Sequence, residues 1–592
     1  MLWLVVLVLP AFYTLSCIAS LLQNRSLARK TNLPYILFPV YEQNLVWIAV
    51  CQGEWFRYIV KNWLPRSLAD IIFDSTYHHR WTVKERMAER YGGVYLFVTP
   101  GRINVHVGDA DVVTQVCRDR QGFVKRIKNL DALAMYGPNL VTTEGNQWVY
   151  HHRYTAPAFN EKNNALVWAE AVEQARDMLD YWRRQYPEKQ GSQFVVPDPR
   201  EDTQNLALNV ISMAGFGVKL PFKPTSNATA TNAEGRLLRD ADSPPAGYTF
   251  TFRDVMQYMS QSIVSVLVAN GILAQHIPRW TMPFMRKQFL AHADLGKYLQ
   301  AVIDKPDGGL KTHNVLQRIV MSRRVEQTVT DKRNPGLTDS EILGNAYIFM
   351  FAGHETTATT LRFALVLLAL DSDIQEVLHK EVINVLEGQS DDPAKWDYDT
   401  VFPNLVLPLC VMLETLRLYP VAPTTMKATA ESGADLRYNG QTHHLPPDIS
   451  ISLNPSVLHY LEEYWGPDVR TFNPRRWDKR NPDSFLARND GVEGLSVPGL
   501  EHNTIHRPIR GSYIPFSDGE RGCIGKKFAQ VEFVAAIAVL FRNHRVRLAR
   551  LGDETDEDAR ARVKRALEGC WAPVTLAIHE KVPLAFERRD TA

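Results

Sequence analysis

The chain has 592 residues, 45% of them hydrophobic and 22% charged, a composition typical of a globular protein with a large core. Its formal net charge of +2 gives no support to nucleic-acid binding. The 6 cysteines are scattered and form no CxxC pair, which argues against a disulfide framework or a structural zinc site and favours a reducing compartment.

The N-terminal segment is apolar and free of charge from residue 2 to residue 22. Some 20 helical residues span ~30 Å, the hydrocarbon thickness of a bilayer. Arg25, Arg29 and Lys30 follow, so the positive-inside rule places the rest of the chain in the cytosol. A cleaved signal peptide is the alternative, but a basic n-region is missing and the apolar run is long. We therefore expect a transmembrane anchor over residues 1–24.

Residues 25–75 are expected to link this anchor to the remainder of the chain. The apolar stretch 33–51 is broken by proline and glutamate, which predicts a core or interfacial segment rather than a second span. Helical periods dominate the rest of the sequence, with strand-like pieces at 94–98 and 102–107. The polar, small-residue stretch 221–247 predicts a loop.

A long apolar helix is predicted from a polar start at Thr338 to about residue 370. On one of its faces the small residue Ala352 is followed one turn later by Thr356, which leaves room for a diatomic ligand and a hydroxyl to bond it. A threonine inside a helix can bond its i−4 carbonyl, loosening the backbone and admitting water. The adjacent Glu355 can supply the protons that splitting O₂ requires.

Two other interpretations of this helix are to be considered. It could be a buried helix with incidental threonines. A zinc site fails, because His354-Glu355 lacks the second histidine at position 358, which is alanine.

Glu414 and Arg417 lie three residues apart in the apolar helical run VMLETLRLYP, and this spacing puts them on one helix face. A charge pair in so apolar a stretch needs further partners to offset its desolvation. A solvated surface pair is the alternative, since the Glu-x-x-Arg spacing is common.

The stretch 516–525, FSDGERGCIG, places one cysteine in a glycine-rich loop before a predicted helix. A thiol at a helix N-terminus beside an arginine has a lowered pKa, and its thiolate is a good axial ligand for haem iron. The glycines let the backbone approach a porphyrin, Phe516 can shield the sulfur of Cys523, and Arg521 can reach a haem propionate. A buried structural cysteine is the alternative, but it leaves the glycines, phenylalanine and arginine unexplained.

Taken together, these motifs resemble the cytochrome P450 family. The loop fills every fixed position of the haem-thiolate signature Phe-x-x-Gly-x-Arg-x-Cys-x-Gly, and residues 352–356 match the Ala/Gly-Gly-x-Asp/Glu-Thr motif. The likeness runs from about residue 33 to the C-terminus, with the motifs in the family's order. It implies a mainly α fold with small β-sheets, a single catalytic domain over residues 76–592, and haem b held by Cys523.

The resemblance also assigns catalytic and structural roles. Thr356 would be the oxygen-side alcohol and Glu355 its acid, with Gly353 beside the haem. Glu414 and Arg417 would be joined by Arg476, from the Pro-x-Arg segment 474–476, in a brace that positions the haem loop.

Further residues are implied to bind the haem propionates. Trp148 and the residue four positions later, His152, occupy the family's propionate-binding positions. The usual residue at the second position is arginine, so Arg153 is the alternative to His152. Lys427 also stands where arginine is common; lysine can neutralise a propionate but cannot bind it through a planar fork.

The implied activity is insertion of one atom of O₂ into a lipophilic small molecule, by hydroxylation or epoxidation. No flavin-binding region follows the haem loop, so electrons would come from NADPH through a separate diflavin NADPH–cytochrome reductase. Lys526 and Lys527 could help to dock it, or could simply form a solvated helix face. The implied location is the endoplasmic reticulum membrane, single-pass, in contact with lipid and facing the cytosol.

The substrate pocket is expected to be lined by segments 126–141, 272–284, 345–349 and 422–426, all largely apolar; ordinary core is the alternative. Trp280, Met282 and Phe284 could instead enter the bilayer. Two other functions remain: a haem-thiolate isomerase or dehydratase needing no external electrons, against which Glu355-Thr356 weighs, and a non-enzymatic haem sensor.

Overall fold

The computed structural model describes residues 2–41, 47, 50–51, 54–74, 81, 83–127, 130–187, 193–223, 243–267, 269–270, 278–304, 314–320, 336–492, 495, 503–572 and 575–589. Much of the predicted loop 221–247 and part of segments 33–51, 126–141 and 272–284 lie outside these residues. The chain divides into two compact units. Unit 1 comprises Met1–Arg126, Glu414–Cys523 and Cys570–Ala577, and unit 2 comprises Ile127–Leu413, Ile524–Gly569 and Ile578–Ala592.

Unit 1 is organised around a six-stranded sheet of order β1-β2-β3-β9-β6-β4. Its strands are β1 (Tyr35–Leu37), β2 (Val94–Val98), β3 (Ile103–Val107), β4 (Phe123–Lys125), β6 (Thr425–Thr429) and β9 (Ser450–Leu453). The strands β2 and β3 are buried throughout and pair antiparallel, with Val94 opposite Val107. The two strand-like pieces of the sequence are thereby confirmed. A separate hairpin joins β7 (Ala434–Tyr438) to β8 (Gln441–Leu445).

Unit 1 also contains seven described α-helices. They are α1 (Leu2–Lys30), α3 (Glu54–Trp63), α4 (Arg66–Asp74), α6 (Arg86–Tyr91), α7 (Ala110–Arg118), α19 (Pro455–Leu458) and α20 (Glu462–Trp465). Of these, α1 and α6 contact β2. At the start of α7, the Asp109 carboxylate accepts a hydrogen bond from the Val112 backbone N–H at 2.9 Å. The apolar face of α7 then packs, with Val113 and Val116, into the same buried cluster as the strands.

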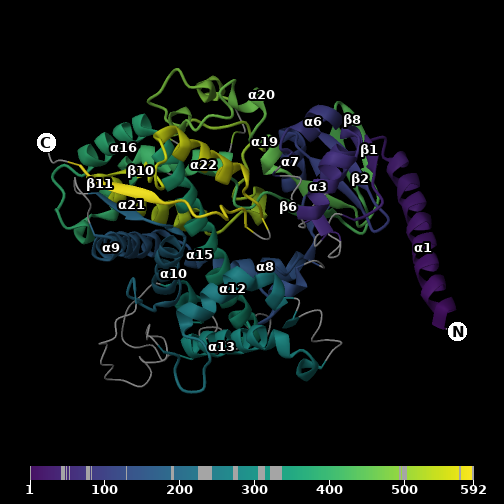
Figure 1. The fold of residues 1–592 in the computed structure, drawn as a ribbon, viewed down its shortest axis with the longest axis horizontal. Helices are drawn as coiled ribbons and strands as arrows, with labels where there is room; N and C mark the ends of the chain where they lie inside the picture. The colour runs from purple at the N-terminus through teal and green to yellow at the C-terminus, as the bar shows by residue number, and fades with distance from the viewer. Residues whose placement is uncertain are drawn as a thin grey trace. The chain divides into compact units, whose positions relative to one another are not determined.

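The N-terminal helix α1 continues past the segment predicted as an anchor and packs against β2 (Figure 1). Asn24 donates to the Thr99 carbonyl at 2.8 Å, and Ala28 is fully buried. Earlier along the helix, Phe12, Leu15 and Ile18 are exposed. Among the described residues, no single helix is long and apolar enough to cross a membrane; the bent pair Tyr398–Asn404 and Val406–Leu418 reaches that threshold only together.

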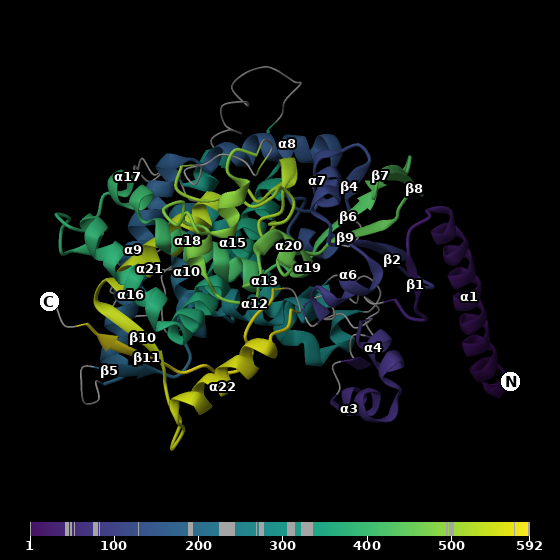
Figure 2. The ribbon, with the colours of Figure 1, turned by 90° about the horizontal axis from the view of Figure 1, so that it is seen from above.

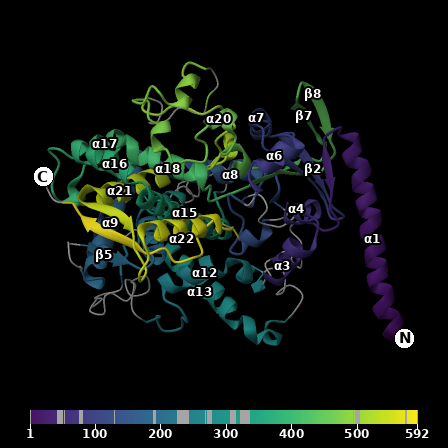
Figure 3. The ribbon, with the colours of Figure 1, turned by 45° about the horizontal axis from the view of Figure 1, so that its top comes forward.

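Unit 2 is mainly helical. Its helices are α8 (Gly145–Thr155), α9 (Glu161–Gln185), α10 (Arg200–Phe216), α12 (Phe252–Leu267), α13 (Arg286–Ile303), α15 (Asp339–Leu370), α16 (Ser372–Val385), α17 (Tyr398–Val401), α21 (Lys526–Asn543) and α22 (Asp556–Glu568). The helix α18 (Val406–Leu418) begins in unit 2 and ends in unit 1. The helices α9, α10, α15 and α21 pack together (Figure 1), and α12 lies beside α13 (Figure 3).

A small antiparallel sheet of order β10-β11-β5 completes unit 2 (Figure 2). Its strands are β10 (His544–Leu548), β11 (Leu584–Arg588) and β5 (Gln193–Val196). The long helix α15 starts as the sequence predicts: the Thr338 hydroxyl and the Glu341 side chain cap each other's backbone N–H groups. The predicted class, mainly α with small sheets, is confirmed.

Candidate functional site

The cysteine loop lies in unit 1 and is held by its own backbone. The Cys523 N–H donates to the Phe516 carbonyl at 2.9 Å, and the Gly522 N–H donates to the Gly519 carbonyl at 2.9 Å. The Cys523 side chain is exposed, whereas Cys117 and Cys410 are buried. An exposed thiol on a backbone-tied loop is presented to a ligand, which a cysteine that only fills core volume is not.

Gly519 is required by the contact of this loop with α7. Its φ is +71°, and a Cβ there would lie 2.5 Å from the Cys117 carbonyl oxygen. Any side chain at 519 would therefore strain the backbone and push the loop off the helix. The structure thus gives this glycine a role besides the close approach to a porphyrin expected from the sequence.

Charged groups surround the cysteine loop. Arg510 pairs with Asp518 at 3.2 Å, and both side chains are mostly buried. Burial raises the pKa of the Cys117 thiol to about 11, with Lys427 lowering it and Asp518 raising it. Those two groups therefore lie near Cys117, and Cys117 remains a neutral thiol.

Lys427 fits an anionic ligand. It lies on β6 directly opposite Lys125 on β4, and its own side chain is buried. Like charges on opposing strand positions repel, so positive charge gathers at this point of the sheet. A carboxylate-bearing cofactor such as haem is a chemically suitable ligand for it. Phe516 and Arg521 are half-buried in the cysteine loop of the same unit.

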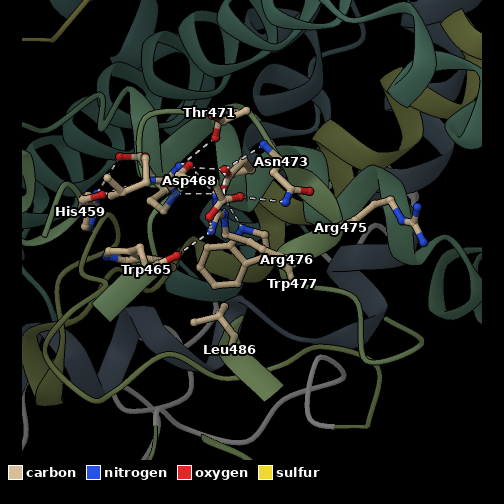
Figure 4. A network of polar contacts seen from close by, with 12 residues as sticks. His459, Trp465, Asp468, Thr471, Asn473, Arg475, Arg476, Trp477 and Leu486 are labelled. Atoms are coloured by element: carbon tan, nitrogen blue, oxygen red, sulfur yellow. Dashed lines mark hydrogen bonds and ion pairs between the residues drawn. The ribbon is translucent and has the colours of Figure 1, made fainter. Parts of the chain in front are cut away.

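The structure brings together Glu414, Arg417 and Arg476, all buried in unit 1. Arg417 binds the Glu414 carboxylate through Nε at 2.9 Å and Nη2 at 2.8 Å, and Arg476 Nε binds it at 3.0 Å. The Asn473 N–H and the Trp477 indole N–H, 3.0 and 2.9 Å away, also donate to this carboxylate (Figure 4). Five donors thus converge on one buried anion.

The other N–H donors of the two guanidinium groups also have partners. Arg476 binds Asp468 through Nη1 at 3.0 Å and Nη2 at 2.9 Å, and Arg417 Nη1 donates to the His459 and Val469 carbonyls. Burial raises the pKa of Glu414, but Arg417 and Arg476 outweigh it and bring that pKa down to about 2. The brace is therefore an ionised and saturated network.

His459 connects this brace to Ile514, two residues before the cysteine loop, a link that the sequence does not reveal. Its Nδ1 lies 3.0 Å from the Arg417 carbonyl, and its Nε2 accepts from the Ile514 N–H at 3.3 Å. This pattern assigns the proton to Nδ1. Burial, together with Arg417, lowers the pKa of His459 to about 3, so the ring is neutral. His459 belongs to no motif, and only its contacts show the role.

In unit 2, three threonines of α15 bond their i−4 carbonyls. Thr356 donates to the Ala352 carbonyl at 2.8 Å, Thr357 to Gly353 at 3.2 Å and Thr360 to Thr356 at 2.8 Å. Ala352 is exposed and Thr356 half-buried, whereas Thr357 and Thr360 are buried. Of the three hydroxyls, that of Thr356 is therefore the one on the open side of the helix.

The neighbours of Thr356 have distinct settings. The Glu355 Oε2 atom is buried and accepts no hydrogen bond, although its side chain has other contacts. Burial and the charge of Glu355 raise the pKa of the Tyr347 phenol, whose hydroxyl is likewise buried without a hydrogen bond. A water molecule would satisfy such atoms. A Cβ on Gly353 would meet Ile211 of α10 at 3.3 Å, so glycine here also permits close packing of α10.

On α8, the imidazole of His152 lies against the buried Trp148, with ring centroids 4.9 Å apart. Arg153 is exposed and lies over the Tyr154 ring. The structure thus brings His152 rather than Arg153 beside Trp148.

Comparison with known proteins gives one family. The model described as "Cytochrome P450" matches residues 71–567. A cytochrome P450 monooxygenase of Arthrobotrys oligospora is 29% identical, covering 96% of this chain and 95% of its own length. The cytochrome P450 monooxygenase prx9 of Penicillium rubens is 28% identical, with 95% and 93% covered. A Leptosphaeria maculans protein named "Phomenoic acid biosynthesis cluster cytochrome P450 monooxygenase" is 24% identical over 90% of each chain.

Proposed function

Because the chain belongs to the cytochrome P450 family, whose members are haem-thiolate monooxygenases, we propose that it hydroxylates or epoxidises a lipophilic small molecule. It is a monooxygenase with haem b as cofactor, and it uses O₂ and a reductase partner. The haem, when bound, supplies the binding and cleavage of O₂. The observation that carries the proposal is the exposed Cys523 thiol. The loop that presents it is held by a hydrogen bond of 2.9 Å from the Cys523 N–H to the Phe516 carbonyl.

We assign Cys523 as the axial ligand. The buried Lys427, opposite Lys125, offers positive charge to a propionate, and the Trp148–His152 pair offers indole and imidazole donors. Arg521 is a further candidate from the cysteine loop. Arg153 is the weaker candidate, because it is exposed and lies over Tyr154.

On α15, Glu355 and Thr356 form the proton path of the proposal. Glu355 is the acid of this path, and water would carry protons between its carboxyl group and the Thr356 hydroxyl. That hydroxyl can exchange its 2.8 Å bond to the Ala352 carbonyl for one to a group on the open side of the helix. The small side chain of Ala352 leaves space there.

Electrons are proposed to come from NADPH through a diflavin reductase. Lys526 and Lys527 remain candidates for docking an acidic partner surface. Lys527 also has a contact within unit 2, since its ammonium lies 4.3 Å from the centre of the Phe402 ring.

We propose a location on the endoplasmic reticulum membrane, with α1 as single-pass anchor and the rest of the chain facing the cytosol. The exposed apolar side chains of α1 support this, as do Trp55, Tyr58 and Trp63 on α3. In unit 2, Trp280 and Phe284 are 83% and 73% exposed, so they too suit a lipid surface. Alkaline extraction of membranes tests the anchor: a protein released by carbonate has none.

The first test is the carbon monoxide difference spectrum of the reduced protein expressed with haem precursor. We expect the red-shifted Soret band of a thiolate ligand, and its loss in Cys523→Ala. Cys17→Ala, in α1, is the matched control and should keep the band. A protein without this band, or a Cys523→Ala variant that retains it, contradicts the assignment.

A further inference from the structure

The segment that precedes α8 is docked closely on the N-terminal end of α15. A Cβ on Gly344 would lie 2.4 Å from the Gly137 carbonyl oxygen, and one on Gly137 would lie 2.1 Å from the Ser340 carbonyl oxygen. Backbone therefore contacts backbone here, and neither glycine can be replaced without separating the two segments. The turn therefore cannot shift slightly while it stays in contact with α15; to move, it must separate from the helix.

Asn139 gives the turn 137–142 its internal shape. It is fully buried, and its Oδ1 accepts from the Val141 and Thr142 N–H groups at 3.0 and 3.1 Å. Its Nδ2 donates backwards to the Leu133 carbonyl at 3.0 Å. The turn and the residues before it therefore move as one piece.

Asn345 of α15 ties this piece to two helices. Its Oδ1 accepts from the Leu140 N–H at 2.9 Å. Its Nδ2 donates to the Glu341 carbonyl at 2.7 Å and to His151 Nδ1 of α8 at 2.9 Å. Because Asn345 is fully buried, each of these bonds would be costly to lose. One amide thus joins the turn, α8 and α15.

This arrangement requires a neutral His151. Its Nδ1 must accept from Asn345, while its Nε2 lies 3.3 Å from Glu341 Oε1 without the geometry of a hydrogen bond. A protonated ring would carry a hydrogen on Nδ1, facing the Asn345 amide hydrogens. Turning the amide would relieve that conflict, but would leave the Leu140 N–H facing another donor. Protonation therefore breaks the tie to the turn.

The electrostatic setting of His151 points the same way. Burial lowers the pKa of His151, and the nearby Glu341 carboxylate and Asn345 partly oppose this. Glu341 is the charged group that faces the ring among the described residues, and its other oxygen is engaged in the cap of α15 with Thr338. The neutral ring is thus the resting form near pH 7.

The residues just before the turn 137–142 also contact α13. Tyr136 stacks on His292 with ring centroids 4.7 Å apart, and its hydroxyl donates to the His292 carbonyl at 2.7 Å. Its ring also lies 4.9 Å from that of Tyr347 on α15. The sequence predicts residues 126–141 and 345–349 as pocket lining, so the Asn345 tie holds together two segments expected to face the substrate.

We propose that Asn345 and neutral His151 form a latch that fixes the turn 137–142 on α15 and thereby sets the substrate affinity of the enzyme. Asn345 is a positioning residue: it acts through Leu140 and not on the reacting atoms. The effect on substrate affinity rests on the proposed function, whereas the latch itself does not. Opening it, by mutation or by protonation of His151, loosens the turn and weakens binding of a large ligand.

The latch is tested first by hydrogen–deuterium exchange of the Leu140 amide in the haem-loaded protein. We expect Asn345→Ala to speed this exchange at least tenfold. Asn404→Ala is the matched control, because Asn404 is exposed and its amide bonds only the Thr400 carbonyl one turn earlier. Unchanged exchange in Asn345→Ala overturns the latch.

The unmodified protein gives a second measurement, which stands even if Asn345→Ala fails to fold. After correction for the intrinsic pH dependence of exchange, Leu140 should exchange faster as pH falls below about 6.5, the ordinary histidine pKa. In His151→Phe the exchange should be fast and independent of pH in this range. A flat profile in the unmodified protein contradicts the role of His151.

Ligand binding is tested with 1-octylimidazole, whose ring binds haem iron while its chain enters the pocket. We expect at least threefold weaker binding in Asn345→Ala and unchanged binding of imidazole itself. Equal affinities for the long probe overturn the link to the pocket. Failure of the proposed function is seen separately, as loss of the thiolate carbon monoxide band, so the two outcomes are distinguishable.

Discussion

Two glutamates, one in each unit, are buried to the same extent but differ in protonation: one is ionised, and burial favours the neutral form of the other. Glu414 and Glu532 both have 0% exposure, on α18 and α21. Glu414 receives bonds from two arginines, an indole and a backbone N–H, and its pKa falls to about 2. Neither carboxyl oxygen of Glu532 has a hydrogen bond to any residue that the structure describes, and burial raises the pKa of Glu532 well above the usual range. Partners, and not burial, decide whether a buried acid is ionised.

This difference in partners also predicts which of the two glutamates can be replaced without loss of stability. Around Glu414, removing one charged partner leaves a buried ion with fewer counter-charges than it has in the intact network. Burial raises the pKa of Glu532 and so favours its neutral form, which an amide of the same shape would resemble. The brace should therefore be sensitive to every polar substitution, and α21 tolerant at position 532.

The largest effect is expected from Glu414→Ala. It leaves Arg417 buried without its anion and Arg476 with Asp468 as its remaining carboxylate, and breaking a buried pair in this way costs about 3–5 kcal/mol. The measurement is the urea midpoint, together with haem content. A loss below about 1 kcal/mol would show that the brace is not the ionised network described here.

Acid should weaken unit 1 through His459. Its folded-state pKa of about 3 lies below the ordinary 6.5, so the unfolded chain binds the proton first and stability falls as pH drops below about 6.5. Between pH 6.5 and 4 the loss should reach ~3 kcal/mol. Glu414 adds a further loss only below its ordinary value, as pH falls through 4.5 toward 2. His459→Gln should flatten the first part of the urea-midpoint profile; an unchanged slope contradicts this.

Thr356→Ala should alter the chemistry with little effect on stability, whereas substitutions in the Glu414 brace should mainly affect stability. Removing the hydroxyl interrupts the proposed proton path, so the peroxide formed per product should rise about tenfold or more. Thr359→Ala, three residues on in the same helix, is the matched control. The ratio of peroxide to product is the readout, and an unchanged ratio would remove Thr356 from the path.

The smallest effect is expected from Glu532→Gln. The substitution replaces a neutral acid by a neutral amide of the same shape, so the change in unfolding free energy should stay below about 1 kcal/mol. Glu414→Gln, by contrast, removes the charge between two guanidinium groups. Comparable losses in the two glutamine variants would mean that Glu532 is ionised, against the comparison above.

The features that the sequence could predict depend on residues close together in the chain. The capped start of α15 follows from Thr338 and Glu341, and the buried hairpin β2–β3 from its β-branched and aromatic residues. The threonine–carbonyl bond of Thr356 follows from helix geometry alone. The cysteine loop and the Glu414–Arg417–Arg476 set were found because each is a fixed pattern in a fixed order.

The rest depends on contacts between distant segments. His459 meets Ile514, and Asn345 meets both Leu140 and His151, through pairings that no local spacing encodes. The requirement for glycine at 519 likewise comes from α7, some four hundred residues earlier in the chain. The packing of α1 on the sheet through Asn24 was hidden because its apolar composition suits a membrane as well as a core.

The strand order of the six-stranded sheet constrains how the protein is made. The strands β9 and β6 lie between β3 and β4, so β3 and β4 cannot be joined in one sheet until Leu453 has left the ribosome. At ~5–20 residues per second this wait is on the order of tens of seconds. The nascent chain must carry an incomplete sheet with the buried strand β3 unpaired on one side throughout that time. We expect chaperone binding to concentrate there during synthesis.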